Sequence, residues 1–300
     1  MTRELGSRLT AEDLSHVALQ VGAQFDIPEV LQGRARCVSY HDGSLAEAIR
    51  SPYWAGELNA REVDRALAYE RKVYHGVDRI FTMSEYLRRS FIENFEVPAE
   101  KVYNVGGAIN LEAIPGPAFG KSYDGSEILF IGVQFERKGG PQLLEAFRAV
   151  RSQIPRAILH IVGPRGLTIP PGREAGVEFH GYLSKSDPVD RARLEALFQR
   201  CSLFVMPSLY EPFGVAPLEA MAHQIPCVVT GRWALPEIVR PGVTGELVEA
   251  GRVDELQSKI CTLLSDPDAL RRMGEAGRNR VLEAYTWEHV VRRIGQALPG

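Results

Sequence analysis

Residues 202–219, with the sequence SLFVMPSLYEPFGVAPLE, are the stretch that decides the fold. Residues 203–206 are apolar without alternation, which is typical of a short strand buried on both faces. Pro212 and Gly214 predict a tight turn, and Pro217 suits the first turn of a following helix, where its missing N–H costs nothing. The stretch therefore predicts a strand, a turn and the N-terminus of a helix.

The predicted turn has the composition of a nucleotide-sugar site. A helix N-terminus attracts phosphate through its unpaired N–H groups and its dipole, and Gly214 lets a diphosphate approach the backbone beside Val215. Glu211 and Glu219 bracket the turn, and carboxylates are acceptors suited to the hydroxyl groups of a sugar or ribose. Either glutamate alone could be a solvated loop residue or a complement to the dipole. The joint pattern favours the binding site.

Composition limits the class of protein. The 300 residues suffice for two domains, and 45% hydrophobic with 24% charged residues is ordinary for a soluble globular protein. A net charge of −3 implies no general attraction to nucleic acid. The four cysteines are widely spaced and form no C-x-x-C pair, which suits a reducing, cytoplasmic location. No signal peptide or long apolar run is present, so we expect at most peripheral membrane contact.

Short apolar strands alternate with amphipathic helices along the chain. This alternation predicts an α/β protein with parallel sheets and helices on both faces. We expect a turn at residues 26–28 and a helix from Lys138 to Arg151. The expected organisation is an N-terminal Rossmann-like domain over 1–112, a linker over 113–125, a C-terminal domain over 126–285 and a terminal helix over 286–300.

The loops after four predicted strands of the second half emerge at one edge of the sheet, where doubly wound folds bind ligands. The strands are expected at 127–133, 157–162, 203–206 and 226–230. Their loops contain Lys138, Gly163, Glu211 and Glu237, so the sequence predicts that these residues converge in space.

The segments Glu-Pro-Phe-Gly and Pro-Leu-Glu-Ala-Met-Ala around Glu211 and Glu219 resemble the E-x7-E signature of retaining GT-B glycosyltransferases of the family 4 type, also called glycosyl transferases group 1. The resemblance covers nearly all of residues 127–290 and, more weakly, 36–110. It implies the GT-B fold, in which two Rossmann-like doubly wound domains face a cleft and the last helix crosses back to the first domain. It also implies that Glu211 borders the donor sugar and that Glu219 holds the ribose.

The segment Phe-Glu-Arg-Lys-Gly-Gly at 135–140 resembles the phosphate-binding segment of the same family, with Lys138 at the position that contacts the donor diphosphate. The family arginine beside the preceding glycine is replaced by Val133, and Arg137 could take over its charge. The alternative is that Arg137 and Lys138 are solvated charges at a helix start. Cations there oppose the helix dipole, which favours the functional interpretation.

Three further positions carry a resemblance to the family. His180-Gly181-Tyr182 resembles the segment that borders the nucleotide base, with His180 itself read as a packing residue. Glu237, after Pro236, resembles the loop beside the sugar. His41 resembles the histidine that faces the sugar from the acceptor side, and a structural role for His41 is an equal alternative.

The resemblance implies a metal-independent hexosyltransferase that retains the anomeric configuration. The donor would be a UDP- or GDP-sugar, and the acceptor a glycan, a lipid-linked molecule or a small molecule. The chain has no H-E-x-x-H, no clustered Cys/His set and no D-x-D between a strand and a loop, so no metal or other cofactor is expected.

Two features leave other functions open. Only forty residues precede His41, which predicts a shortened first domain, and Val133 replaces the family arginine. The alternative is a non-catalytic nucleotide- or glycan-binding protein, or one subunit of a split transferase whose first domain is completed by a protein partner. An epimerase or phosphorylase on the same fold is a third interpretation. The identities of the sugar, the base and the acceptor are not predicted.

Overall fold

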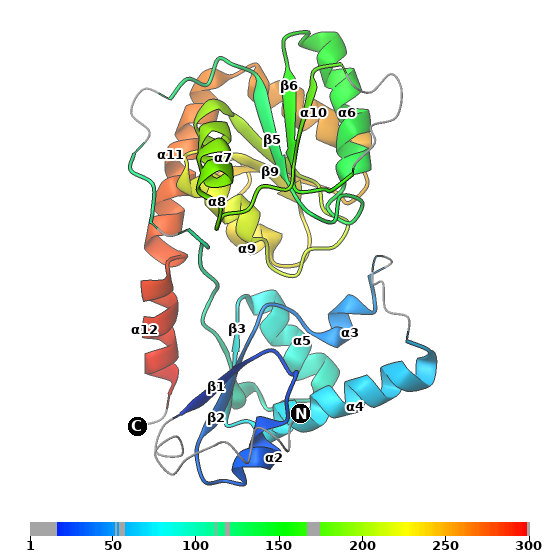
Figure 1. The fold of residues 1–300 in the computed structure, drawn as a ribbon, viewed down its shortest axis with the longest axis vertical. Helices are drawn as coiled ribbons and strands as arrows, with labels where there is room; N and C mark the ends of the chain where they lie inside the picture. The colour runs from blue at the N-terminus through cyan, green and yellow to red at the C-terminus, as the bar shows by residue number, and fades with distance from the viewer. Residues whose placement is uncertain are drawn as a thin grey trace. The chain divides into compact units, whose positions relative to one another are not determined.

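The computed structural model describes residues 17–51, 53, 58–111, 113–117, 121–166 and 175–298. These residues form two compact α/β units (Figure 1). The first unit contains the described residues up to Gly107 together with those from Trp287 onward, and the second unit runs from Ala108 to Thr286. Each unit is built around one parallel sheet, which confirms the predicted α/β class with two Rossmann-like sheets.

The first sheet has four parallel strands in sequence order: β1 (Ala18–Val21), β2 (Cys37–His41), β3 (Arg79–Thr82) and β4 (Val102–Asn104). The helices α2 (Ile27–Leu31), α3 (Leu45–Ala48), α4 (Ala60–Gly76) and α5 (Glu85–Phe95) lie between these strands in the chain. Ser84 caps α5 by accepting a hydrogen bond from the Leu87 N–H, which satisfies one N–H that lacks a partner within the helix.

The turn predicted at residues 26–28 is wrong, because a helix starts there. The Asp26 side chain accepts a hydrogen bond from the Glu29 N–H, and Pro28 lies within the first turn of α2. An N-cap aspartate followed by a proline satisfies one orphan N–H and presets the helical φ, so these residues start a helix.

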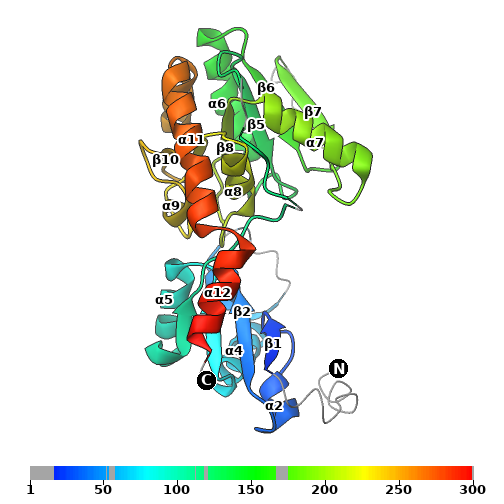
Figure 2. The same ribbon diagram turned by 90° about the vertical axis from the view of Figure 1, so that its left-hand side faces the viewer.

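The last helix of the chain contacts the first sheet through Tyr40 of β2, whose side chain lies on one face of that sheet. The Tyr40 ring lies 6.4 Å from the ring of Trp287 in α12 (Trp287–Ala297). Arg293 of α12 donates a hydrogen bond to the Val105 carbonyl oxygen at 3.0 Å. The last helix therefore packs on the first unit, as predicted, and Figure 2 shows α12 beside this sheet.

The second sheet has six parallel strands in the order β10-β9-β8-β5-β6-β7. Their bounds are β5 (Glu127–Ile131), β6 (Ile158–Val162), β7 (Val177–Gly181), β8 (Leu203–Met206), β9 (Cys227–Thr230) and β10 (Gly245–Val248). The strand order reverses between β5 and β8, and such a switch point opens a crevice for ligands at the carboxyl ends of these strands.

Helices cover both faces of the second sheet (Figure 1). Helices α6 (Gly140–Gln153) and α10 (Val253–Leu264) lie on one face, and α7 (Pro188–Arg200), α8 (Val215–Ala222) and α11 (Pro267–Ala284) lie on the other. The short helix α9 (Leu235–Ile238) follows β9. Phe130, Phe147, Phe198 and Phe204 are fully buried between these layers. Among the described helices, none is both long and apolar enough to cross a lipid bilayer.

Candidate functional site

Two loops meet at the switch point of the second sheet. The Leu209 N–H, in the loop after β8, donates to the Arg137 carbonyl oxygen in the loop after β5, at 2.8 Å. Gly139 has a φ of +77°, and a Cβ at this position would lie 2.1 Å from the Pro207 carbonyl oxygen. Only glycine allows this approach, so the sequence at 139 brings the two loops together.

Lys138 and Glu211 form an ion pair across this junction. Their side chains are only 14% and 7% exposed. Burial lowers the pKa of the Lys138 ammonium, and the Glu211 carboxylate opposes that effect. Helix α6 begins at Gly140 rather than at Lys138 as predicted, because Gly139 is its N-cap, so Lys138 lies in the loop. The pair therefore holds one cation and one anion at the carboxyl ends of β5 and β8.

Arg137 is attached to the same loop. Its guanidinium donates to the Tyr210 carbonyl oxygen at 2.7 Å, bonds the Gln134 side chain and lies 6.0 Å from the centre of the Tyr210 ring. Val133, by contrast, is an exposed side chain. A second positive charge thus lies beside Lys138, supplied by Arg137 and not by residue 133.

The N-terminus of α8 follows directly. Gly214 is its N-cap with a φ of +108°, and no described side chain caps the helix. The N–H groups of Val215 and Ala216 therefore lack an intrahelical partner, and they carry the positive end of the helix dipole. A Cβ on Gly214 would lie 2.7 Å from Leu235 Cδ2, so α9 packs tightly against this turn.

Glu219 lies on α8 and is almost fully buried. It forms an ion pair with Lys185, whose Nζ also donates to the Asn110 carbonyl oxygen at 3.1 Å. Burial raises the pKa of Glu219, while the Lys185 ammonium and the Asn110 N–H oppose the rise. Lys185 was missed in the sequence because it lies 34 residues from Glu219 and belongs to no motif.

Gly163 and Tyr182 follow the two strands on the other side of β5. Gly163 has a φ of +121°, and a Cβ there would lie 2.6 Å from the Gly132 carbonyl carbon. The Tyr182 ring is 44% exposed, and the Arg165 guanidinium lies 4.6 Å from its centre. This pair presents an aromatic and a planar cationic group, both of which stack on flat rings. No motif in the sequence identified Arg165 as a site residue.

Glu237 lies in α9, not in a loop as predicted. Its backbone oxygen accepts hydrogen bonds from Tyr285, at 2.7 Å, and from Arg280. Because α9 packs against Gly214, Glu237 belongs to the elements around the same turn. The Tyr210 and Trp233 rings meet edge to face at 5.7 Å and connect the loops after β8 and β9.

His41 lies in the first unit and is only 2% exposed. Its ring contacts Tyr74 and Phe91, with centroids 5.2 Å and 4.9 Å away. Burial lowers its pKa to about 3, so the ring is neutral. Its Nε2 has no hydrogen-bond partner among the described residues. These contacts favour the structural alternative for His41 over the acceptor-side role.

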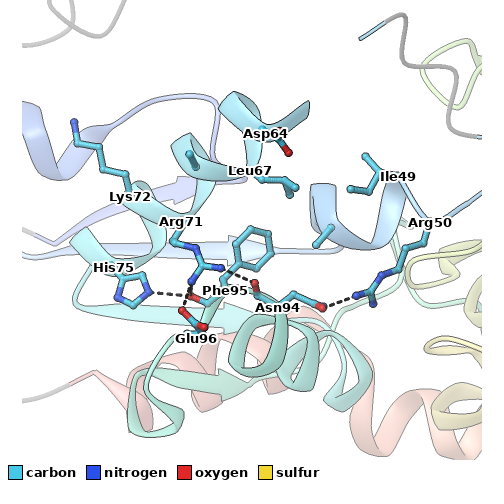
Figure 3. Close-up of a pocket in the computed structure, with 12 residues that line it drawn as sticks. Ile49, Arg50, Asp64, Leu67, Arg71, Lys72, His75, Asn94, Phe95 and Glu96 are labelled. Atoms are coloured by element: carbon cyan, nitrogen blue, oxygen red, sulfur yellow. Dashed lines mark hydrogen bonds and ion pairs between the residues drawn. The ribbon is translucent and has the colours of Figure 1, made fainter. Parts of the chain in front are cut away.

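A pocket of about 790 Å³ lies in the first unit, where α3, α4 and α5 contribute its walls (Figure 3). Arg50, Arg71 and His75 line it together with apolar side chains such as Leu67 and Phe95. Arg71 is paired with Glu96, and Arg50 with Asn94. None of the predicted site residues is among the described residues that line this pocket. We therefore do not assign the sugar-donor site to it.

Two groups of potential metal-ligand side chains that form no cluster in the sequence come together in the structure. His160, Glu178 and His180 place potential ligand atoms within 4.8 Å of one another, and Glu127, His160 and Cys201 form a second such group. The sequence signal was the spacing Glu178-x-His180, which puts both side chains on one face of a strand. The sequence did not reveal the third member, His160, because it lies on a different strand, β6.

Residues 118–280 match the model of the family described as glycosyl transferases group 1. The chain belongs to this family. The match spans both loops of the switch point and the Glu211–Glu219 stretch.

Comparison with individual members gives the same family. The MMP α-(1→4)-mannosyltransferase of Mycolicibacterium hassiacum is 28% identical over 224 residues, which are 74% of this chain and 54% of that protein. The glycogen synthase of Mycobacterium tuberculosis H37Rv is 26% identical over 290 residues, 94% of this chain and 66% of that protein. This group 1 chain thus spans between about half and two thirds of these relatives' lengths.

Among solved structures, Anabaena Alr3699/HepE in complex with UDP and glucose has a TM-score of 0.70 and 17% identity. The match covers 98% of this chain and 80% of that one. At this identity the likeness concerns the fold alone. It confirms, for this group 1 chain, the GT-B class that the sequence predicted.

Proposed function

We propose that this chain is a retaining hexosyltransferase that moves a sugar from a nucleotide diphosphate to an acceptor hydroxyl. Its family is the first support. One relative is named as a mannosyltransferase, and one solved structure of the same fold contains UDP and glucose, which favours a hexose donor with UDP or GDP. The acceptor would be a glycan, a lipid-linked molecule or a small molecule.

The observation that carries the proposal is the buried Lys138–Glu211 ion pair beside the uncapped N-terminus of α8. A diphosphate at the switch point would attract the Lys138 ammonium and the N–H groups of Val215 and Ala216. Glu211 would then be released to accept hydrogen bonds from sugar hydroxyl groups. The same two side chains therefore serve both ends of the sugar–phosphate bond.

The nucleoside would occupy the other side of the turn. Glu219 would accept hydrogen bonds from the ribose hydroxyl groups, which requires that Lys185 shares or yields its carboxylate. The Tyr182 ring and the Arg165 guanidinium would border the base, and Gly163 would let the backbone come close.

The transfer step breaks the bond from the anomeric carbon to the phosphate oxygen and forms a bond to the acceptor oxygen on the same face. The departing phosphate takes the acceptor proton. Lys138, Arg137 and the α8 dipole stabilise the negative charge that develops on that phosphate, so a metal ion is not required for this purpose. Glu211 and Glu237 would orient the sugar. His41 has no role in this step, because its buried ring packs against Tyr74 and Phe91 and favours the structural alternative.

Calorimetry with UDP, GDP, ADP and their sugar conjugates tests the binding site. We expect one nucleotide to bind near the micromolar range, which corresponds to about −8 kcal/mol. Glu219→Ala should weaken that binding, whereas Glu249→Ala, at a more exposed glutamate of the same unit, should not.

Turnover of the bound sugar nucleotide, followed by release of the free nucleotide, tests the reaction. Binding with turnover supports the transferase. Binding without turnover by the pure chain, restored by a partner protein, would support the alternative of a split transferase. Binding of no nucleotide would contradict the proposed site.

A further inference from the structure

The edge strand of the second sheet carries two potential metal ligands that face a buried histidine. His160 Nδ1 on β6 lies 3.1 Å from His180 Nε2 and 3.2 Å from the Glu178 Oε2, both on β7. The His160 side chain is completely buried, while Glu178 is 48% exposed. These three groups have no part in the proposed transfer reaction.

The backbone of β7 positions His180 for this contact. Glu178 pairs with His160, but Gly181 rather than His180 pairs with Val162, because the register shifts between Ile161 and Val162. One residue of β7 is therefore extra, which is the definition of a β-bulge. Bulges redirect side chains. Here the extra residue is His180, and its imidazole faces His160.

We propose that His160, His180 and Glu178 bind one zinc ion. Two imidazoles and a carboxylate are a common zinc ligand set, with water as the fourth ligand. Bonds of about 2.0–2.1 Å at tetrahedral angles separate neighbouring ligand atoms by about 3.3 Å. The separations of 3.1 Å and 3.2 Å already match this value. The third, 4.0 Å between His180 Nε2 and Glu178 Oε2, closes by rotation of the exposed glutamate.

Glu127 contacts the ring nitrogen of His160 that does not face the cluster. Its Oε2 lies 2.9 Å from His160 Nε2 and 3.0 Å from the Arg200 guanidinium. A carboxylate at this position accepts the Nε2–H and leaves Nδ1 as the lone-pair atom that faces the cluster. Carboxylates that hold a ligand histidine in this way are typical of zinc sites. Glu127 is therefore a positioning residue for the ion.

The location gives the site a structural purpose. β7 is an edge strand, and most of its residues are only partly buried. An ion held by β6 and β7 would fasten this edge beside Tyr182, which follows the strand directly. Zinc would therefore stabilise the edge of the sheet without taking part in transfer chemistry.

The test uses the full chain after treatment with a chelator. Zn²⁺ is titrated by calorimetry, and Co²⁺ is followed by its visible absorption, which reports a tetrahedral environment with nitrogen ligands. We expect one ion per chain and a higher melting temperature in the presence of Zn²⁺. Glu127→Gln should weaken binding by about 10–100-fold, as is typical for a residue that positions a ligand, and His180→Gln and Glu178→Gln should each weaken it more.

The control is His75→Gln, at an exposed histidine of the first unit that contacts only a backbone oxygen among the hydrogen bonds described. It should bind Zn²⁺ like the unmodified chain. Melting temperatures of the metal-free variants show whether they are folded, and only folded variants are compared. The proposal is overturned if the unmodified chain binds no stoichiometric Zn²⁺ or Co²⁺, or if folded His180→Gln binds as tightly. Either result would identify His160 as an imidazole bridging two glutamates.

Discussion

The Lys138 ammonium and the Glu211 carboxylate are in direct contact although 73 residues separate them in the chain. The contact exists because β5 and β8 are neighbours in the sheet, so the loops after these strands emerge together. Both side chains are largely buried, and a buried ion pair contributes little net stability once desolvation is counted. We propose that the pair supplies charged groups for a bound ligand.

Replacement of Lys138 should lower catalysis in addition to stability, because it also leaves the Glu211 carboxylate buried without its partner. Lys138→Met removes the charge that we assign to the departing phosphate, and loss of such a group typically lowers the rate about 10²–10³-fold. Steady-state kinetics with the donor identified by calorimetry provide the measurement. Lys259→Met is the matched control, since Lys259 is paired with Glu246 elsewhere in the same unit. A kcat equal to that of the unmodified chain would show that Lys138 does not stabilise the departing phosphate.

Glu211→Gln should destabilise the fold because it leaves the Lys138 ammonium buried without its partner. Breaking a buried pair costs about 3–5 kcal/mol of unfolding free energy. Urea denaturation measures this loss. The double variant Glu211→Gln/Lys138→Met should recover most of it, since no unpaired charge remains. Additive losses in the two single variants would mean that the residues are not energetically coupled.

Gly139→Ala should be more harmful than Gly166→Ala, although both glycines have positive φ. A Cβ at Gly139 would meet the Pro207 carbonyl oxygen at 2.1 Å, whereas a Cβ at Gly166 would have no atom of the described residues within 4 Å. Gly166→Ala therefore measures backbone strain alone, about 1–2 kcal/mol. Gly139→Ala adds the separation of the two site loops, so both stability and nucleotide affinity should fall. Equal unfolding free energies for the two variants would show that the close approach is unimportant.

Stability should decline with acidity because His41 is buried in neutral form. Its pKa is lowered by burial to about 3, below the ordinary value of 6.5. The unfolded chain thus binds a proton that the folded chain does not, and the contribution is complete above pH 6.5. It is lost at about 1.4 kcal/mol per pH unit as pH falls toward 3.

His41→Phe keeps the aromatic packing against Tyr74 and Phe91 and removes this titration. Unfolding free energies measured from pH 7 to pH 5 should therefore fall less steeply in the variant. The histidine His223, whose pKa burial lowers to about 4, remains in both proteins and cancels in the comparison. Identical slopes would indicate that the His41 ring is protonated in the folded state or reaches solvent.

Local sequence patterns predicted much of the fold correctly. The strand at 203–206, the turn at Gly214 and the helix beyond it follow from apolar residues, glycine and proline whose preferences act within a few residues. The same stretch carries the family signature, and the family is confirmed. The start of α2 at Asp26 was missed because Asp and Pro favour both turns and helix N-termini.

The sequence by itself thus determined the α/β class, the family and the residues that line the loops of the switch point. Only the tertiary structure decided which of these side chains meet. The pairing of Lys185 with Glu219, the contact of Arg165 with Tyr182 and the cluster around His160 depend on which strands are neighbours. Strand order is set by burial of the whole sheet between two helical layers, and this is not encoded in any local stretch of residues.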